Sequence, residues 1–396
     1  FKNDQILFTA YSDGGTSLIN DEDYVAGMTT AAVISEGGVG AFSRIELQKR
    51  LAGKMVRVSP LIGELEEGLS GSASPQDVET MFQLIYLYFT APRKDSTAFL
   101  AYKEQMRGFL ENKSASPNAA FQDTIQVTMS QYHHRRRPWS LELLEEMDLG
   151  KSYAFYKDRF ADASDFTFVL IGNFDPDGIR PLVQTYLGGL PTLNRDESWK
   201  NVGVKPPSGV IDKQLYKGME AKSLTRIILT GPFEWKRRNR YELGSMAQVL
   251  RIKLREILRE DLGGTYGVSV RAAPSRFPEE RFRLTVHFGC DPERVQELTA
   301  VVFEQIDSLK TFGTTMKYLT KVKETQTRER ETNLKRNEFW LNIVETYDYH
   351  GEALLDILRY DELVDGLSLE AIRNAAQRYL SIANYVQVTL YPEGFE

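Results

Sequence analysis

The sequence of 396 residues is poor in the residues from which disulfide frameworks and metal sites are built. Its single cysteine, Cys290, excludes an internal disulfide and any multi-cysteine metal site. No two histidines have the i, i+4 spacing that places two imidazoles on one helical face for zinc. We therefore expect no metal ligand in this chain. The four histidines are His133, His134, His287 and His350.

Long apolar runs and an excess of positive charge are also absent. No stretch approaches the roughly 20 apolar residues that span a bilayer, so we expect no membrane insertion. The formal net charge of -6 argues against a chain built mainly to neutralise nucleic-acid phosphates. A hydrophobic fraction of 42% and a charged fraction of 26% are typical of a globular protein, and the length suggests two domains.

Three charged or glycine-rich stretches have simple structural explanations. Residues 36–42, EGGVGAF, follow a helical pattern and lack the Gly-Lys-Ser/Thr of a phosphate loop, so they indicate a helix end. Residues 326–340 mix both charges at helical spacing, which is typical of an exposed helix. Residues 133–138, HHRRRP, indicate a solvated basic helix end, with a peptide- or phosphate-binding role as the alternative.

An internal repeat organises the chain. Three pairs of segments share the same order of helical, polar and strand-like patterns, and the members of each pair lie roughly 220 residues apart. Such a repeated order indicates two copies of one α+β unit. The pairs are residues 5–14 and 225–235, residues 68–89 and 286–306, and residues 153–175 and 371–394.

Between the copies, residues 189–209 are rich in proline, glycine and charge without periodicity, as in a linker. We predict a first α+β repeat at residues 1–195, a linker at 196–211 and a second repeat at 212–396. Within each copy the strands and helices are clustered rather than strictly alternating. The predicted fold class is therefore α+β, with two homologous domains, each a mainly antiparallel sheet with helices packed on one face.

The stretch from Arg259 to Val268, REDLGGTYGV, joins a helical pattern to a strand-like pattern. Gly263 and Gly264 predict a left-handed exit from the helix, which glycine adopts at low cost. Arg259 and Tyr266 are then expected to face the same side of one turn. A guanidinium fork and a phenol hydroxyl together suit carbonyl oxygens or a carboxylate. A charge at a helix end and a sheet aromatic would explain the two residues without a ligand.

The spacing from Arg259 to Tyr266, the glycines between them and the duplicated units resemble the pitrilysin/insulinase-type zinc peptidases, the inverzincins. In that family four related α+β domains form two halves around a chamber. The first half carries a His-x-x-Glu-His zinc helix, and the last quarter carries an Arg/Tyr pair that contacts the bound peptide. The resemblance covers essentially the whole chain and implies that it corresponds to the C-terminal half, the third and fourth domains.

The departure from the family pattern concerns the metal. Where the zinc helix would fall in the first repeat, residues 28–32 read MTTAA, and none of these side chains binds zinc. Glu104 and Glu111 fall where the distal carboxylates of that family would be. Without histidines beside them, we interpret both as remnants or surface charges.

The resemblance implies that the complete protein is a zinc-dependent endopeptidase and that this chain is its non-catalytic, substrate-binding half. Arg259 and Tyr266 are the implied substrate-binding residues, and Tyr266 would donate a hydrogen bond to the developing oxyanion. The implied partners are peptide substrates and an N-terminal peptidase half, in the same or a separate chain. Zinc would be held outside this chain, which is predicted to be inactive alone.

Two other functions stay open at this point. One is a structural or assembly subunit of the same fold with no proteolytic role. The other is nucleic-acid binding through residues 133–138, which the acidic net charge disfavours. The chain begins at Phe1 without an apolar signal segment, and we interpret it as a piece of a longer protein. The family resemblance suggests the periplasm, with the cytoplasm as the alternative.

Overall fold

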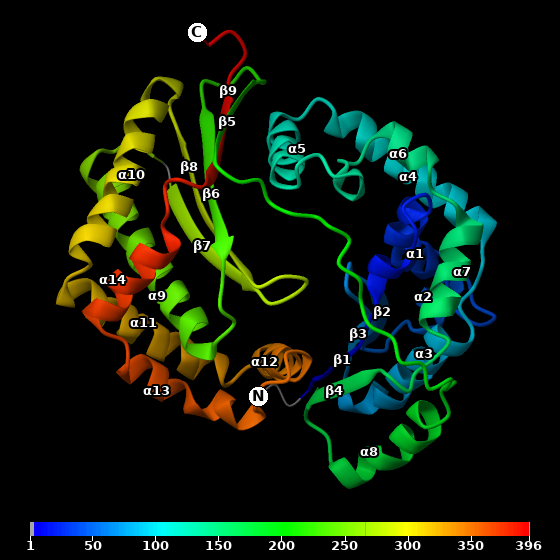
Figure 1. Ribbon diagram of the computed structural model, residues 1–396. Coiled ribbons are helices and arrows are strands. Elements are labelled where there is room, and N and C mark those ends of the chain that lie inside the picture. The colour runs from blue at the N-terminus through cyan, green and yellow to red at the C-terminus, as the bar shows by residue number, and fades with distance from the viewer. Residues whose placement is uncertain (1–3, 266, 396) are drawn as a thin grey trace. The chain divides into compact units, whose positions relative to one another are not determined.

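The computed structural model describes residues 4–265 and 267–395, which form two compact units (Figure 1). Unit 1 consists of residues 1–111, 139–202 and 331–354. Unit 2 consists of residues 112–138, 203–330 and 355–396. Each unit is an α+β structure built on one sheet, so the predicted fold class is confirmed.

The sheet of unit 1 is antiparallel throughout, with the strand order β2-β3-β1-β4. In its centre, Ile6 of β1 lies opposite Ala73 of β3 on one side and opposite Gly172 of β4 on the other. Strand β2 forms one edge of the sheet. The strands are β1 (Ile6–Asp13), β2 (Val56–Ile62), β3 (Glu66–Ala73) and β4 (Thr167–Gly172).

Some helices of unit 1 begin at side chains that accept hydrogen bonds from free backbone N–H groups. Ser43 and Glu46 form a capping box at the start of α2, and the Asp148 side chain accepts from the Lys151 N–H at the start of α7. Large side chains such as Phe82 of α3 fill the core against the sheet. The helices are α1 (Tyr24–Gly37), α2 (Arg44–Arg50), α3 (Val78–Thr90), α4 (Ser96–Lys113), α6 (Leu141–Glu145), α7 (Leu149–Arg159), α8 (Pro176–Leu182) and α12 (Asn337–Tyr349).

The sheet of unit 2 has the strand order β5-β9-β6-β8-β7. All its neighbouring strands are antiparallel except β5 and β9, which are parallel. The strands are β5 (Val210–Tyr216), β6 (Ser223–Pro232), β7 (Gly267–Ser275), β8 (Arg281–Cys290) and β9 (Tyr385–Tyr391). The helices are α5 (Pro117–Met129), α9 (Arg237–Leu254), α10 (Val295–Phe312), α11 (Met316–Asn333), α13 (Tyr360–Asp365) and α14 (Leu369–Tyr379).

The two sheets repeat one topology. Strands β2-β3-β1-β4 of unit 1 correspond in order to β7-β8-β6-β9 of unit 2, which adds β5 at its edge. Pro75 and Pro292, matched in the sequence repeat, each open a short 3-10 helix that leads into α3 or α10. This correspondence supports two copies of one α+β unit.

Two helices pack in a different unit from the chain segments around them. Helix α5 follows α4 in the chain but packs on β9 in unit 2. Helix α12 follows α11 but packs on β1 and β4 in unit 1. The stretch 326–340, predicted as one exposed helix, instead ends α11 at Asn333 and begins α12 at Asn337. The prediction of one continuous helix was wrong, because the second part of this stretch packs on the sheet of the other unit.

Residues 191–208 contain neither helix nor strand, as expected of a connection. The Asp162 carboxylate holds its first part by accepting hydrogen bonds from the N–H groups of Leu193 and Arg195, at 2.9 and 2.7 Å. Division at residues 195 and 212 stays a prediction, because it follows the sequence repeat whereas the two units are defined by contacts.

Candidate functional site

The turn that carries Arg259 is built at the end of α9. This helix continues as a π-helical segment, Arg255–Asp261, before the chain turns. Gly263 has a φ of +57°, so the predicted left-handed exit is confirmed at this residue. Gly264 serves a different need, because a Cβ there would lie 2.8 Å from the Leu298 side chain.

Hydrogen bonds attach this turn to the sheet of unit 2. The buried Thr265 hydroxyl donates to the carbonyl of Gly289 at 2.6 Å and accepts from the N–H of Gly267 at 3.1 Å. From the start of α10, the Arg294 guanidinium donates to the carbonyl of Leu262 at 3.1 Å. The backbone on both sides of the turn is therefore fixed by tertiary contacts.

Arg259 belongs to the π-helical segment that leads into this fixed turn, and its side chain is exposed. No ion pair or hydrogen bond joins it to another residue that the structure describes, whereas Arg255 lies 3.6 Å from Glu260. An unpaired guanidinium on a rigid support is available to a ligand. Tyr266 lies outside the described residues, so its position relative to Arg259 stays a prediction.

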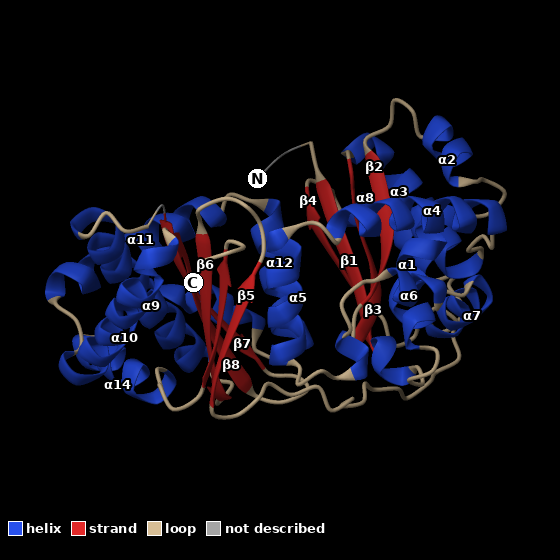
Figure 2. Ribbon diagram, turned by 90° about the horizontal axis from the view of Figure 1, so that it is seen from above, coloured by secondary structure: helices blue, strands red, loops and turns tan. Residues whose placement is uncertain are grey.

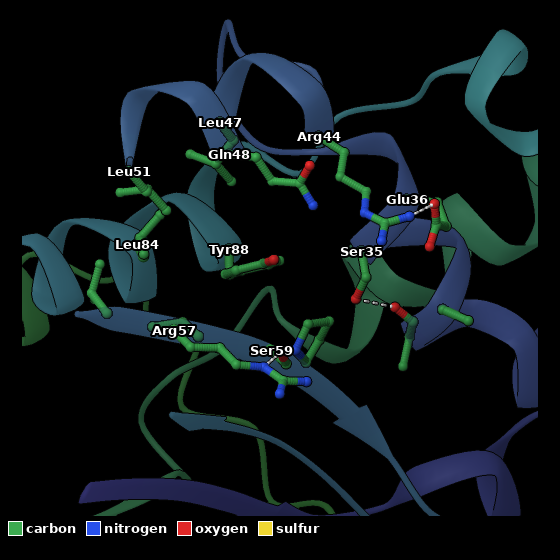
Figure 3. Close-up of a pocket in the computed structure, with 15 residues that line it drawn as sticks. Ser35, Glu36, Arg44, Leu47, Gln48, Leu51, Arg57, Ser59, Leu84 and Tyr88 are labelled. Atoms are coloured by element: carbon green, nitrogen blue, oxygen red, sulfur yellow. Dashed lines mark hydrogen bonds and ion pairs between the residues drawn. The ribbon is translucent and has the colours of Figure 1, made fainter. Parts of the chain in front are cut away.

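A cleft of about 690 Å³ lies in unit 1 between α1, α2, α3 and the edge strand β2 (Figure 3). Its lining is largely apolar, with Leu47 and Leu84 among the labelled side chains. Arg44 forms an ion pair with Glu36 across its rim, and Arg57 donates to the Ser59 hydroxyl at 3.3 Å. Apolar walls with a few hydrogen-bond donors suit an uncharged or peptide-like ligand better than a phosphate.

The same cleft tests whether zinc fits the first repeat. Ala31 and Ala32, from the MTTAA stretch, line the cleft, whereas Thr29 and Thr30 are buried and donate to helix carbonyls. Glu36 is the one carboxylate in the lining, which includes no histidine or cysteine. Within residues 4–265 and 267–395, no group of three His, Cys, Asp or Glu is placed to hold a metal. The residues present at this position do not fit zinc.

The remaining candidate residues are His133, His134, His287, Glu104 and Glu111, and their places in the fold agree with structural or surface roles. The rings of His133 and His134 stack with their centroids 4.4 Å apart, beside a short 3-10 helix (His134–Arg136) rather than at the end of a long helix. His287 lies on β8, as expected of its alternating pattern. Glu104 and Glu111 are exposed on α4, in agreement with surface charges.

Cys290 is buried at the end of β8, and burial raises the pKa of its thiol to about 11. A thiol with a raised pKa carries little thiolate near neutral pH. It therefore acts as a small apolar residue, not as a nucleophile.

Two features that the structure assembles were not predicted from the sequence. The apolar cleft of unit 1 had no motif, because its lining comes from four separate elements. An arginine-rich face of the sheet in unit 2 was visible only as alternation in β8, where Arg281, Arg283 and His287 stand two or four residues apart. That period of two was available in the sequence as a signal.

Comparison with known proteins confirms the resemblance predicted from the sequence. Residues 147–326 match the family described as the peptidase M16 inactive domain. The chain is 25% identical over 425 residues to a protein named zinc protease PQQL-like from Arabidopsis thaliana, covering 99% of this chain and 41% of that protein. It thus spans about two fifths of the length of this relative.

Solved structures show the same fold. The periplasmic protease PqqL from Escherichia coli superposes with a TM-score of 0.85 at 19% identity, covering 99% of this chain and 43% of that one. The first half of the same protease also matches, with a TM-score of 0.77 at 11% identity over 98% of this chain and 87% of that one. The fold of this chain is therefore also similar to that of the first half of that protease. In the part that the structure describes, no helix has the length and apolarity required to cross a membrane.

Proposed function

This chain resembles the inactive half of the M16 zinc peptidases in sequence and fold, and we propose that it is the non-catalytic, substrate-binding half of a zinc-dependent endopeptidase. It would help to enclose peptides that are hydrolysed at a zinc site outside this chain. Arg259 would bind a substrate carbonyl or carboxylate, and Tyr266 would donate a hydrogen bond to the oxyanion that develops during hydrolysis. No step of the metal chemistry is assigned to these residues.

The observation that carries this proposal is the exposed Arg259 on a turn fixed by Thr265 and Arg294. A guanidinium that serves only the helix end would gain by pairing with a nearby carboxylate, as Arg255 pairs with Glu260. Arg259 has no such partner among the described residues. The apolar cleft of unit 1, with its donors, adds a second surface that suits peptide.

The test is peptide turnover by the complete protein that contains this chain. Replacing Tyr266 with Phe removes one donor to the oxyanion and is expected to lower kcat by about a hundred- to a thousandfold. Arg259→Ala is expected to raise KM, because it removes a contact that binds the substrate. Arg255→Ala is the matched control, since it removes an arginine from the same helical segment without touching the proposed contact.

Unchanged turnover in both the Tyr266 and Arg259 variants would favour the rival function, a structural or assembly subunit with no proteolytic role. The proposed partner is an N-terminal peptidase half, in the same chain or another. The periplasm is the proposed compartment, because the similar protease PqqL is described as periplasmic.

A further inference from the structure

The two faces of the sheet in unit 2 have different chemistry. Leu284 and Val286 of β8 belong to the core that the sheet forms with α9, α10 and α14. Their neighbours Arg283, Thr285 and His287 therefore lie on the opposite face, because successive side chains of a strand point to opposite sides.

Helix α5 covers only part of this opposite face. Its side chains Phe121 and Ile125 pack on Ile228 of β6 and Val388 of β9. Figure 2 shows α5 on the side of the sheet away from α9, α10 and α14. Strands β7 and β8 contribute no side chain to this apolar cluster. Apart from His287 of β8, whose ring centroid lies 6.3 Å from that of Phe121, the β7–β8 part of the face is left without an apolar cover from α5.

Arginines stand on this β7–β8 part of the face. In the strand register Arg271 of β7 lies opposite Thr285, and Arg283 lies opposite Ala273. The two arginines are therefore diagonal neighbours, roughly 7–8 Å apart at the backbone. Both are exposed, and no ion pair or hydrogen bond joins either guanidinium to another described residue.

A third arginine, Arg226 of β6, lies opposite His287 on the same face. Its Nη1 donates to the Gln122 side chain at 2.8 Å, and its guanidinium lies 5.4 Å from the centre of the Phe121 ring. Burial and the nearby Arg226 lower the pKa of His287, so this imidazole is neutral at pH 7 and adds no charge. We call Arg226, Arg271 and Arg283 the arginine face.

No carboxylate of the sheet balances the arginine face. The strand residues on this side, read from the alternation of β5 to β9 within the described chain, include no aspartate or glutamate. In the β7–β8 hairpin, Glu279 already pairs with Arg281 at 2.6 Å and Lys205 at 3.0 Å. Partial desolvation and, to a lesser extent, the positive charge of Arg136 lower the pKa of Arg283.

We infer that the arginine face binds an acidic stretch of a peptide, so that it selects substrates carrying aspartate or glutamate. This inference rests on the proposed peptide-binding function and adds a substrate class to it. Guanidinium groups bind carboxylates through paired N–H donors. In an extended peptide, alternate side chains lie about 7 Å apart on one side, which is comparable to the spacing of Arg271 and Arg283.

A peptide fits this face better than a nucleic acid does. Sequence-tolerant binding of single strands uses aromatic side chains on which bases stack. Between the arginines of β7 and β8 stand Ser269, Ala273 and Thr285, none of which is aromatic. The net charge of -6 also opposes general binding to phosphate backbones.

The experiment measures binding of three fluorescent peptides of about ten residues to the purified chain by fluorescence anisotropy. The peptides are identical except that alternate positions carry glutamate, glutamine or lysine. We expect the glutamate peptide to bind most tightly, and its advantage to shrink as salt is raised. In Arg271→Ala/Arg283→Ala, its affinity is expected to fall roughly fivefold or more, since two exposed charge pairs are lost.

A matched control removes two exposed arginines from helices on the other face, Arg251→Ala/Arg373→Ala. It makes the same change in net charge and is expected to alter affinity by less than about twofold. The reversal Arg271→Glu/Arg283→Glu is expected to favour the lysine peptide over the glutamate peptide. A reversed preference between the two peptides is a new binding property, which misfolding of the variant would not produce.

The inference would be overturned if the three peptides bound equally, or if the control variant lost as much affinity as Arg271→Ala/Arg283→Ala. Either result would leave the proposed peptide binding intact. If none of the peptides binds, the proposed function fails together with it. If a single-stranded oligonucleotide displaces the glutamate peptide and binds more tightly at the same salt, the face recognises nucleic acid and the inference is wrong.

Discussion

The Tyr11 hydroxyl donates a 2.6 Å hydrogen bond to the Asp348 carboxylate, although 337 residues separate them in the chain. This contact joins β1 to α12, and the rings of Tyr11 and Tyr349 pack edge to face beside it. Burial and Asp348 both raise the pKa of Tyr11, so the phenol remains a donor at any pH near neutrality. We expect Tyr11→Phe to lower the free energy of unfolding by about 1 kcal/mol, measured by urea denaturation.

A double-mutant cycle with Asp348→Ala isolates this contact, because alanine leaves no acceptor for the Tyr11 hydroxyl. We expect a coupling free energy of about 0.5–1.5 kcal/mol between the two changes. Strictly additive effects would show that this hydrogen bond adds no free energy to the packing of α12 on β1.

The apolar contact of α5 has a larger effect. Phe121 is fully buried between this helix and strands β6 and β9, so Phe121→Ala leaves a cavity. We expect a loss of about 3–5 kcal/mol in the free energy of unfolding. Phe109→Ala is the control, because this side chain on α4 is 59% exposed and is expected to change stability by about 0.5 kcal/mol or less. Similar losses in both variants would contradict the packing of α5 on this sheet.

The buried carboxyl of Glu67 makes stability depend on pH. Burial raises the pKa of this carboxyl to about 8, although the N–H of Gly15 and the Arg159 guanidinium, 3.5 Å away, oppose the shift. Burial prevails because Arg159 also pairs with Asp158 and Glu197. The folded protein therefore holds a proton that the unfolded chain releases, so stability falls as the pH rises from about 4.5 to about 8.

Replacing Glu67 with Gln removes this titration. We expect the free energy of unfolding to depend less on pH between about 5 and 8 in the variant, which gains on the wild type as the pH rises. Urea denaturation across that range is the measurement. Glu104→Gln, exposed on α4, is expected to keep the wild-type slope. An unchanged slope in Glu67→Gln would mean that this carboxyl is ionised in the folded protein.

The two glycines of the Arg259 turn should respond differently to alanine. Gly263 has open space around it and a positive φ, so Gly263→Ala is expected to cost about 1 kcal/mol of stability. At Gly264 the added Cβ meets the side chains of Leu298 and Arg294, so Gly264→Ala must displace one of them. We expect peptide binding to weaken more in the second variant, because Arg294 holds the turn. Anisotropy with the peptides above measures this difference.

Local chemistry was sufficient for much of this structure to be predicted. The duplicated α+β units, the strands near residues 166 and 385 and the left-handed Gly263 follow from patterns within a few residues, where hydrophobic period and glycine freedom act directly. The place of Arg259 in the helical segment that precedes the two glycines also followed from its neighbours.

Long-range packing set the rest. Nothing near α5 or α12 indicates that each leaves its neighbours in the chain for another sheet, because the partners of Phe121 and Tyr11 lie hundreds of residues away. The apolar cleft and the arginine face arise in the same way. The alternation of side chains along a strand shows in the sequence that the strand has two faces. Only the helices that pack on the sheet determine which face is covered and which arginines can contact a ligand.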